Sequence, residues 1–275
     1  MLSNFGAAKF DSARSGCATV ARDVHRFCLS LLRTALPQAC TLCTAASGEA
    51  LLCADCRSEM PRNDPACPRC ALPLAAAQTC GACLATPPPF AMTIAPWRYA
   101  FPADRLLRAF KYGGHLALAD AFAVALAQAI AERCAPLPDR VVPIPLSDAR
   151  QRMRGFNHAQ EIARGVALHT GVPLCAGLRR VRDAPPQAGL ARAERLRNVR
   201  GAFLFDRRLD GQVIAIVDDV MTTGATLGAA ALAALHAGAA RVDAWVVART
   251  PRPAHAHARD RHAELHTAGT LARDY

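Results

Sequence analysis

The sequence has almost no lysine, few aromatic residues and no long apolar run. Only two of its 33 basic residues are lysines, and aromatic residues make up 5% of the 275 residues. The most apolar helix candidate, residues 117–131, is interrupted by polar residues and is shorter than the roughly 20 residues that span a bilayer. The first twenty residues lack the basic start and apolar stretch of a secretion signal. We therefore expect a cytoplasmic protein with no membrane insertion.

Arginine supplies nearly all of the positive charge, and it is concentrated in one part of the chain. The formal net charge is +11, and residues 150–208 contain thirteen arginines against four acidic residues. A surface of this kind attracts anions, such as a phosphorylated sugar or a nucleic acid. A solvated basic face without a ligand is the alternative, and charge alone does not separate the two.

Cysteine, in contrast, is abundant, and eight of the twelve cysteines form four Cys-x-x-Cys pairs. The pairs are Cys40/Cys43, Cys53/Cys56, Cys67/Cys70 and Cys80/Cys83. Cytosolic cysteines are seldom disulfide-bonded, and two such pairs supply the four thiolates of a tetrahedral zinc site. We expect one or two structural zinc ions, with the first pair joined to the second and the third to the fourth. Interleaved pairing and a redox role are the alternatives.

Four cysteines stand alone, and we expect them to be packed thiols rather than metal ligands. They are Cys17, Cys28, Cys134 and Cys175.

The most informative segment is residues 213–228, where an apolar run ends in Asp218 and Asp219. A loop of hydroxyl-bearing and small residues follows, and then an alanine-rich helix. The loop consists of Thr222, Thr223, Gly224, Ala225 and Thr226. Free N–H groups at a helix N-terminus favour a phosphate, and carboxylates accept hydrogen bonds from sugar hydroxyls. The segment therefore predicts a phosphorylated ribose as ligand; a buried strand with an acidic cap and no ligand is the alternative.

The remaining pattern predicts four regions. Residues 1–36 form an extension with an amphipathic helix, residues 37–86 a double zinc-ribbon-like module, residues 87–250 an α/β domain, and residues 251–275 a disordered tail. Four histidines make a metal-binding tail the alternative for the last region. Strands alternate with helices in the third region, which is typical of a parallel sheet. The expected strands are 92–99, a short strand from 141, 213–217 and 242–247; the expected helices are 102–112, 116–134, 155–170 and one ending near 238.

The phosphate-loop segment resembles the 5-phosphoribosyl-1-pyrophosphate (PRPP) motif of type I phosphoribosyltransferases. The wider set of motifs is similar to the competence protein F (ComF) family, over roughly residues 37–250. The resemblance is specific in the cysteine pairs, Lys111-Tyr-Gly-Gly, Arg154-Gly-Phe-Asn and the phosphate loop. His158 departs from the family, which usually has glutamine there, so the polar contact of that position is in question.

The resemblance implies a zinc module joined to a phosphoribosyltransferase-like domain that binds PRPP with Mg²⁺. It assigns catalytic roles to Asp218, Asp219, Lys111 and Arg154. It assigns PRPP binding to the two aspartates, the phosphate loop 222–226, and Pro143, Ile144, Pro145, Asn157 and Arg195. A helix-end lysine, surface arginines and a capping asparagine are the alternatives for the single residues.

Two functions follow from this resemblance. The first is an enzyme that transfers phosphoribose to an unknown acceptor, which we expect to be nitrogenous, and releases pyrophosphate, in a protein associated with DNA uptake and competence. The second is a non-catalytic PRPP sensor that binds single-stranded DNA or a competence helicase. The arginine-rich stretch 179–200 could serve as a mobile lid or as the DNA contact. It lacks interleaved aromatic residues, which weakens a base-stacking mode.

Overall fold

The computed structural model describes residues 38–48, 50–133, 136–147, 151–152, 155–181 and 201–252. The expected N-terminal helix and C-terminal tail lie outside these residues. The chain divides into two compact units, Met1–Glu59 and Met60–Tyr275. The boundary falls between the second and third cysteine pairs, whereas the sequence-based boundaries at 36, 86 and 250 stay predictions. Among the described residues, no helix has the length and apolar character needed to cross a membrane.

The first unit contains two short strands and one short helix. Strands β1 (Gln38–Ala39) and β2 (Ala46–Gly48) pair antiparallel. Helix α2 (Ala54–Ser58) begins after Cys53, whose Sγ accepts a hydrogen bond from the Cys56 N–H at 3.4 Å. A cysteine therefore serves as the cap of this helix.

The second unit is built on a parallel sheet. Its strands are β3 (Thr93–Ile94), β4 (Trp97–Arg98), β5 (Arg140–Pro143), β8 (Val213–Met221) and β9 (Arg241–Arg249). The order is β3-β9-β8-β5, with β4 also pairing with β9, and every pair is parallel. The predicted α/β class with a parallel sheet is therefore confirmed.

Three details of the strand prediction were wrong. The expected strand 92–99 is divided into β3 and β4. The expected strand 213–217 continues to Met221, so Asp218 and Asp219 lie within the strand rather than after it. Strands β6 (Leu178–Arg180) and β7 (Phe203–Phe205), which pair antiparallel, were not predicted, because three-residue strands carry little periodicity.

Four helices of this unit follow the sequence pattern closely, namely α4 (Ala103–Tyr112), α5 (Leu118–Glu132), α7 (His158–Thr170) and α9 (Ala225–His236). The short helix α3 (Gly81–Ala85) was not predicted. Leu106, Leu107 and Phe110 are buried on α4. Gly171 ends α7 in a left-handed conformation with φ of 76°, which glycine adopts without steric cost.

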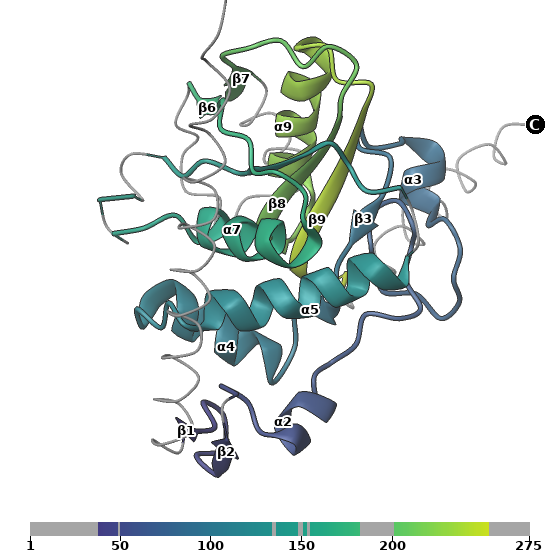
Figure 1. Cartoon of the computed structure of the whole chain (residues 1–275). Coiled ribbons are helices and arrows are strands. Elements are labelled where there is room, and N and C mark those ends of the chain that lie inside the picture. The colour runs from purple at the N-terminus through teal and green to yellow at the C-terminus, as the bar shows by residue number, and fades with distance from the viewer. Residues whose placement is uncertain are drawn as a thin grey trace, which may run out of the picture. The chain divides into compact units, whose positions relative to one another are not determined.

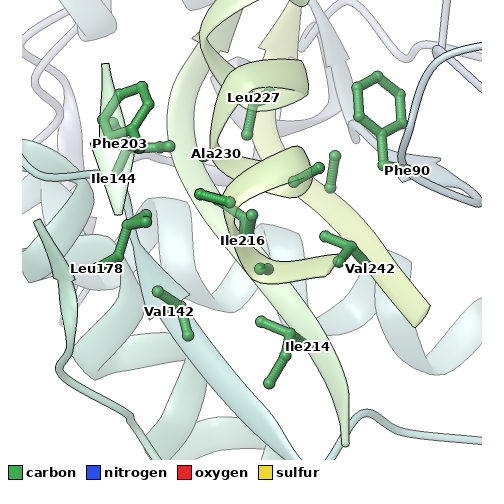
Figure 2. Close-up of a cluster of buried hydrophobic side chains, with 14 of the residues drawn as sticks. Phe90, Val142, Ile144, Leu178, Phe203, Ile214, Ile216, Leu227, Ala230 and Val242 are labelled. Carbon is green, nitrogen blue, oxygen red and sulfur yellow. The ribbon is translucent and has the colours of Figure 1, made fainter. Parts of the chain in front are cut away.

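Alternate residues of the central strands face two layers. Ile214 and Ile216 of β8 pack in one cluster with Val242 of β9 and with Leu227 and Ala230 of α9 (Figure 2). Intervening residues face the other layer, where α5 and α7 lie side by side (Figure 1). Both central strands are thus covered on both faces, as parallel strands require.

The α5–α7 layer is close-packed at one glycine. A Cβ added to Gly165 of α7 would lie 2.5 Å from the Ala123 Cβ of α5. Even alanine at 165 would force the two helices apart. This contact fixes the helix that begins beside the candidate site.

Candidate functional site

The site is formed at the carboxyl ends of β5 and β8. Pro143 pairs with Val217, and the Ile144 N–H donates to the Val217 carbonyl at 2.9 Å. The loop of Pro143, Ile144 and Pro145 therefore runs beside the point where β8 reaches Asp218. Ligands of open α/β sheets bind at this end of the strands.

Lys111 and Asp219 form an ion pair at this end. The Lys111 Nζ lies 2.9 Å from the Asp219 Oδ1, and the side chains are 18% and 12% exposed. Burial lowers the pKa of Lys111, but the carboxylates of Asp219 and Asp218 outweigh it and raise the pKa above its ordinary value. Lys111 is therefore charged at neutral pH. Asp218 Oδ1 accepts the Asp219 N–H at 2.9 Å, which orients the first carboxylate.

His158 holds the helix that carries Lys111. It is buried, and its Nε2 lies 3.2 Å from the carbonyl oxygen of Phe110, the residue before Lys111. Its ring meets that of Phe110 edge-on, with centroids 4.8 Å apart. The polar contact of this family-atypical residue is thus made with the backbone of α4, so it fixes the end of that helix.

Asn157 has a structural role in the described geometry. Its Oδ1 accepts the N–H groups of Ala159 and Gln160 and so caps α7, and its Nδ2 donates to the Ile144 carbonyl at 2.9 Å. It thereby joins α7 to the proline-containing loop. A direct contact between Asn157 and PRPP stays a prediction.

The phosphate loop leads from β8 into α9. Gly224 precedes the helix with φ of 79°, and a Cβ there would meet only ordinary contacts, the nearest at 3.7 Å. The backbone angle, not space, therefore favours glycine. Thr223 Oγ1 accepts the Ala225 N–H at 3.3 Å, and Thr222 is exposed. Thr226 lies in the first turn of α9.

Sequence reasoning missed Arg249. This buried arginine ends β9, and its guanidinium donates to backbone carbonyls that include those of Met221 and Thr222. An arginine after eight mostly apolar strand residues was the available signal. Arg154 and Arg195, in contrast, were expected in the site but lie outside the described residues.

The eight paired cysteines form two clusters, as the spacing predicted. Cluster 1 is Cys40, Cys43, Cys53 and Cys56; cluster 2 is Cys67, Cys70, Cys80 and Cys83. The sulfur atoms of each cluster lie within 4.8 Å of one another. Sequential pairing is therefore confirmed and interleaved pairing is excluded. Cys175 is buried outside both clusters and its Sγ donates to the Ala176 carbonyl, as expected of a packed thiol.

Both clusters fit zinc. Thiolates about 2.3 Å from a tetrahedral zinc lie about 3.8 Å apart, and the Cys43–Cys53 and Cys70–Cys80 sulfur distances are each 3.7 Å. We call the turn that carries one Cys-x-x-Cys pair a knuckle. A bound zinc would join the two knuckles of a cluster and stabilise its fold. With all four ligands supplied by cysteine, neither cluster has the open position of a catalytic zinc.

The thiol pKa values agree with a cation-binding role. Burial raises the pKa of Cys40, but the backbone N–H groups around its sulfur outweigh burial and lower the pKa to about 6. The same opposition lowers the pKa of Cys67 to about 7. Hydrogen bonding with Cys43 and burial raise the pKa of Cys56, and burial and Cys70 raise that of Cys83. Cys40 and Cys67 therefore form thiolates readily, whereas ionisation of Cys56 and Cys83 is favoured only beside a cation.

The chain is similar to known proteins in its cysteine-rich segment and over most of its length. A family model described as the double zinc ribbon domain matches residues 31–84. The chain is 34% identical to the DNA utilization protein YhgH of Salmonella typhi, over 72% of this chain and 90% of that protein. It is 33% identical to YhgH of Escherichia coli (strain K12), over 78% and 98%. It is 28% identical to competence protein F of Haemophilus influenzae, over 72% and 90%.

Among solved structures, the chain resembles a purine phosphoribosyltransferase from Pyrococcus horikoshii Ot3. The TM-score is 0.30 at 17% identity, over 48% of this chain and 82% of that one. A likeness of this size carries no conclusion about substrate.

Proposed function

This chain belongs to the competence protein F (ComF) family, and we propose that its second unit binds PRPP as a phosphoribosyltransferase-like protein. One observation carries the proposal. The strand end that holds Asp218 and Asp219 leads directly into a loop with a left-handed Gly224 at the N-terminus of α9. Acceptors for ribose hydroxyls and donors for a phosphate are thus adjacent on one continuous segment.

Each part of PRPP has a complementary group. The N–H groups and hydroxyls of residues 222–226 suit the 5-phosphate, and the aspartates suit the ribose hydroxyls. Lys111 holds the Asp219 carboxylate in place through the 2.9 Å pair. We assign the pyrophosphate to the Pro143–Pro145 loop, which runs beside Asp218; the resemblance to the family adds Arg154 and Arg195 to this assignment.

The reaction we propose is substitution at the anomeric carbon of PRPP. A nitrogen of the acceptor forms the new bond to that carbon, and pyrophosphate departs with the electron pair of the breaking C–O bond. The two carboxylates stabilise the positive charge that develops on the ribose in the transition state. Asp218 and Asp219 are the hard oxygen donors at this end of β8 that suit Mg²⁺, which binds through few carboxylates plus substrate phosphates and would neutralise the departing pyrophosphate.

Binding is tested by calorimetry with PRPP and Mg²⁺. Asp218→Asn with Asp219→Asn keeps the side-chain shape but removes both charged acceptors. Hydrogen bonds to charged groups contribute about 1.5–3 kcal/mol each, so we expect the Kd to rise at least about tenfold. Asp210→Asn is the matched control, because that exposed carboxylate lies outside the candidate site and pairs with Arg208 at 3.2 Å. Unchanged affinity in the double variant would refute the proposal.

Turnover is a separate question. Purified protein with PRPP, Mg²⁺ and a set of nitrogenous metabolites should release pyrophosphate with at least one acceptor. Binding without release for any acceptor would favour the sensor function instead.

The names of the relatives support a second candidate, contact with single-stranded DNA. These names refer to DNA utilization and competence, and the basic stretch 179–200 is suited to phosphates. We expect affinity that falls steeply with salt and is weakened by combined substitution of Arg195, Arg197 and Arg200 with alanine. Salt-independent binding would exclude this mode.

A further inference from the structure

Arg249 connects the candidate phosphate loop to metal cluster 2. Its Nε donates to the Cys70 carbonyl at 2.8 Å. Its Nη1 donates to the carbonyls of Met221 at 3.0 Å, of Thr250 at 2.8 Å, and of Thr222. Burying a guanidinium is costly unless its N–H groups find acceptors. Here the acceptors come from two segments far apart in sequence, one a metal knuckle and the other the start of the loop.

The knuckle side of this connection is held rigidly within the second unit. Thr93 of β3 donates through its N–H to the Pro68 carbonyl at 3.1 Å and through its Oγ1 to the Arg69 carbonyl at 2.6 Å. Ala71, just after Cys70, is 1% exposed and belongs to the same core cluster as Met221. The Cys70 carbonyl is therefore placed by the sheet and by whatever binds the four thiols.

On the loop side of this connection, Arg249 determines where the backbone N–H groups of the phosphate loop point. In a planar trans peptide, the carbonyl of one residue and the N–H of the next point in opposite directions. By fixing the carbonyls of Met221 and Thr222, Arg249 directs the N–H groups of Thr222 and Thr223 away from itself. These are donors of the loop to which the proposed function assigns the 5-phosphate.

We propose that Arg249 is a positioning residue that couples cluster 2 to the phosphate loop, so that occupation of this cluster by zinc strengthens PRPP binding. This inference rests on the proposed function. Because linkage is reciprocal, PRPP must strengthen metal binding at cluster 2 by the same factor. Cluster 1, which lies in the other compact unit, is assigned no such role.

The first test is Arg249→Lys in the full zinc-loaded chain. Lysine keeps the charge, but its compact ammonium cannot reproduce the fork of a guanidinium. We expect amide hydrogen exchange in residues 221–226 to accelerate about tenfold or more and the Kd for PRPP with Mg²⁺ to rise about tenfold. The matched control is Arg241→Lys at the opposite end of β9, where the arginine pairs with Asp243 at 3.0 Å. It should change neither quantity.

The second test uses cobalt(II) in place of zinc, because its thiolate absorption reports on the cluster directly. PRPP should shift the absorption of cluster 2 in the wild-type chain and in a Cys40→Ser, Cys43→Ser variant, but not in Arg249→Lys. A role in folding alone would not produce this spectral response. If Arg249→Lys fails to fold, the coupling is still tested by whether PRPP shifts the cobalt absorption of cluster 2 in the wild-type chain.

The outcomes separate the two proposals. If the wild-type chain does not bind PRPP, the proposed function fails. The coupling is then tested without PRPP. Amide hydrogen exchange in residues 221–226 is compared between cobalt- or zinc-loaded protein and protein whose cluster 2 has been emptied. Exchange that is the same in both states, or an absorption that PRPP leaves unchanged while it binds, would overturn the coupling.

Discussion

Clusters 1 and 2 have the same ligands and the same nine-residue spacer, but they belong to different compact units. Their first knuckles also share a backbone pattern. Thr44 N–H donates to the Cys40 carbonyl in one, and Ala71 N–H to the Cys67 carbonyl in the other, both at 2.8 Å. The local geometry thus follows from the Cys-x-x-Cys motif itself.

The surroundings of the two clusters differ. In cluster 1 only Cys40 is buried and Cys43 is exposed, whereas in cluster 2 only Cys70 is not fully buried. Cluster 2 also packs with Leu72 and hydrogen-bonds to β3 and β9 through its knuckle. A metal site can therefore stabilise only its own short segment or form part of a larger core, and the ligand spacing does not show which.

The largest expected effect comes from removing one ligand at matched positions. Cys70→Ser should lower the free energy of unfolding of the second unit by more than about 4 kcal/mol, because loss of a metal within a core is among the most destabilising changes. Cys43→Ser should leave the unfolding of that unit within about 0.5 kcal/mol. Urea unfolding followed by tryptophan fluorescence measures this, since both tryptophans, Trp97 and Trp245, lie in the second unit.

Zinc content by mass spectrometry provides the control, since each variant should retain one ion. Equal destabilisation by the two substitutions would contradict the distinction between a local and an integrated cluster.

The next effect tests whether the second unit behaves as one body. Lys111→Met removes one partner of a pair that is largely buried and leaves Asp219 without its ammonium. We expect a loss of about 2–3 kcal/mol, somewhat below the range for fully buried pairs, and weaker zinc retention at cluster 2 only. Arg62→Ala is the control, because the Arg62–Glu132 pair spans 3.8 Å with side chains 76% and 65% exposed and should contribute little.

The pH dependence of this loss has a definite sign. The folded-state pKa of Lys111 is raised, so the stability from the pair is fully present below the ordinary lysine pKa of about 10.4. It is lost as pH rises through the higher folded value. The difference between wild type and Lys111→Met should therefore be constant from pH 6 to about 9.5 and shrink above it. A difference that shrinks already near pH 8 would contradict the raised pKa.

Much of this architecture could be predicted from the sequence because its signals are local. The sequence pattern predicted a helix over residues 102–112, where α4 lies, and cysteine spacing predicted the pairing within both clusters. The end of β8 was misplaced because the charged Asp218 and Asp219 interrupt the apolar run. Backbone pairing with β9 nevertheless continues to Met221.

The candidate site was predictable only in part, since some of its contacts join distant segments. Nothing local to Lys111 indicates that it meets Asp219, and nothing local to His158 indicates that it bonds the end of α4. Arg249 was missed for the same reason, because its acceptors lie near residues 70 and 222. These contacts depend on the register of the folded sheet, which a single sequence does not specify.

A smaller effect concerns the rate of zinc release. Chelation requires local opening, and the opening free energy should be lower for the exposed cluster 1 than for cluster 2. A difference of about 1.4 kcal/mol gives a tenfold difference in rate under the same chelator, so release should occur in two phases at least tenfold apart. Cys43→Ser should abolish the fast phase. A single phase for both ions would show that the clusters open together.

The smallest expected effect comes from a glycine substitution at matched positions, which should be stabilising at cluster 1 and destabilising at cluster 2. The residue after the first knuckle has a left-handed backbone in each: Thr44 with φ of 62° and Ala71 with φ of 51°. Glycine relieves about 1–2 kcal/mol of backbone strain there, against an entropy cost of about 0.5–1 kcal/mol. Thr44 is exposed, so Thr44→Gly should strengthen zinc binding at cluster 1 by about 0.5 kcal/mol. It also loses one hydroxyl hydrogen bond to the Cys43 carbonyl.

Ala71 is 1% exposed in the main core, so Ala71→Gly also forfeits a buried methyl group, about 0.8 kcal/mol, and leaves a small void in a close-packed region. The net result should be a loss of about 0.5–1 kcal/mol. Competition with a zinc chelator measures cluster 1, and urea unfolding measures the second unit. Changes of the same sign would show that the methyl group of Ala71 contributes nothing to the core, and that cluster 2 is no more integrated than cluster 1 at this position. Opposite signs at two positions with the same backbone geometry would instead locate the difference between the clusters in what surrounds them.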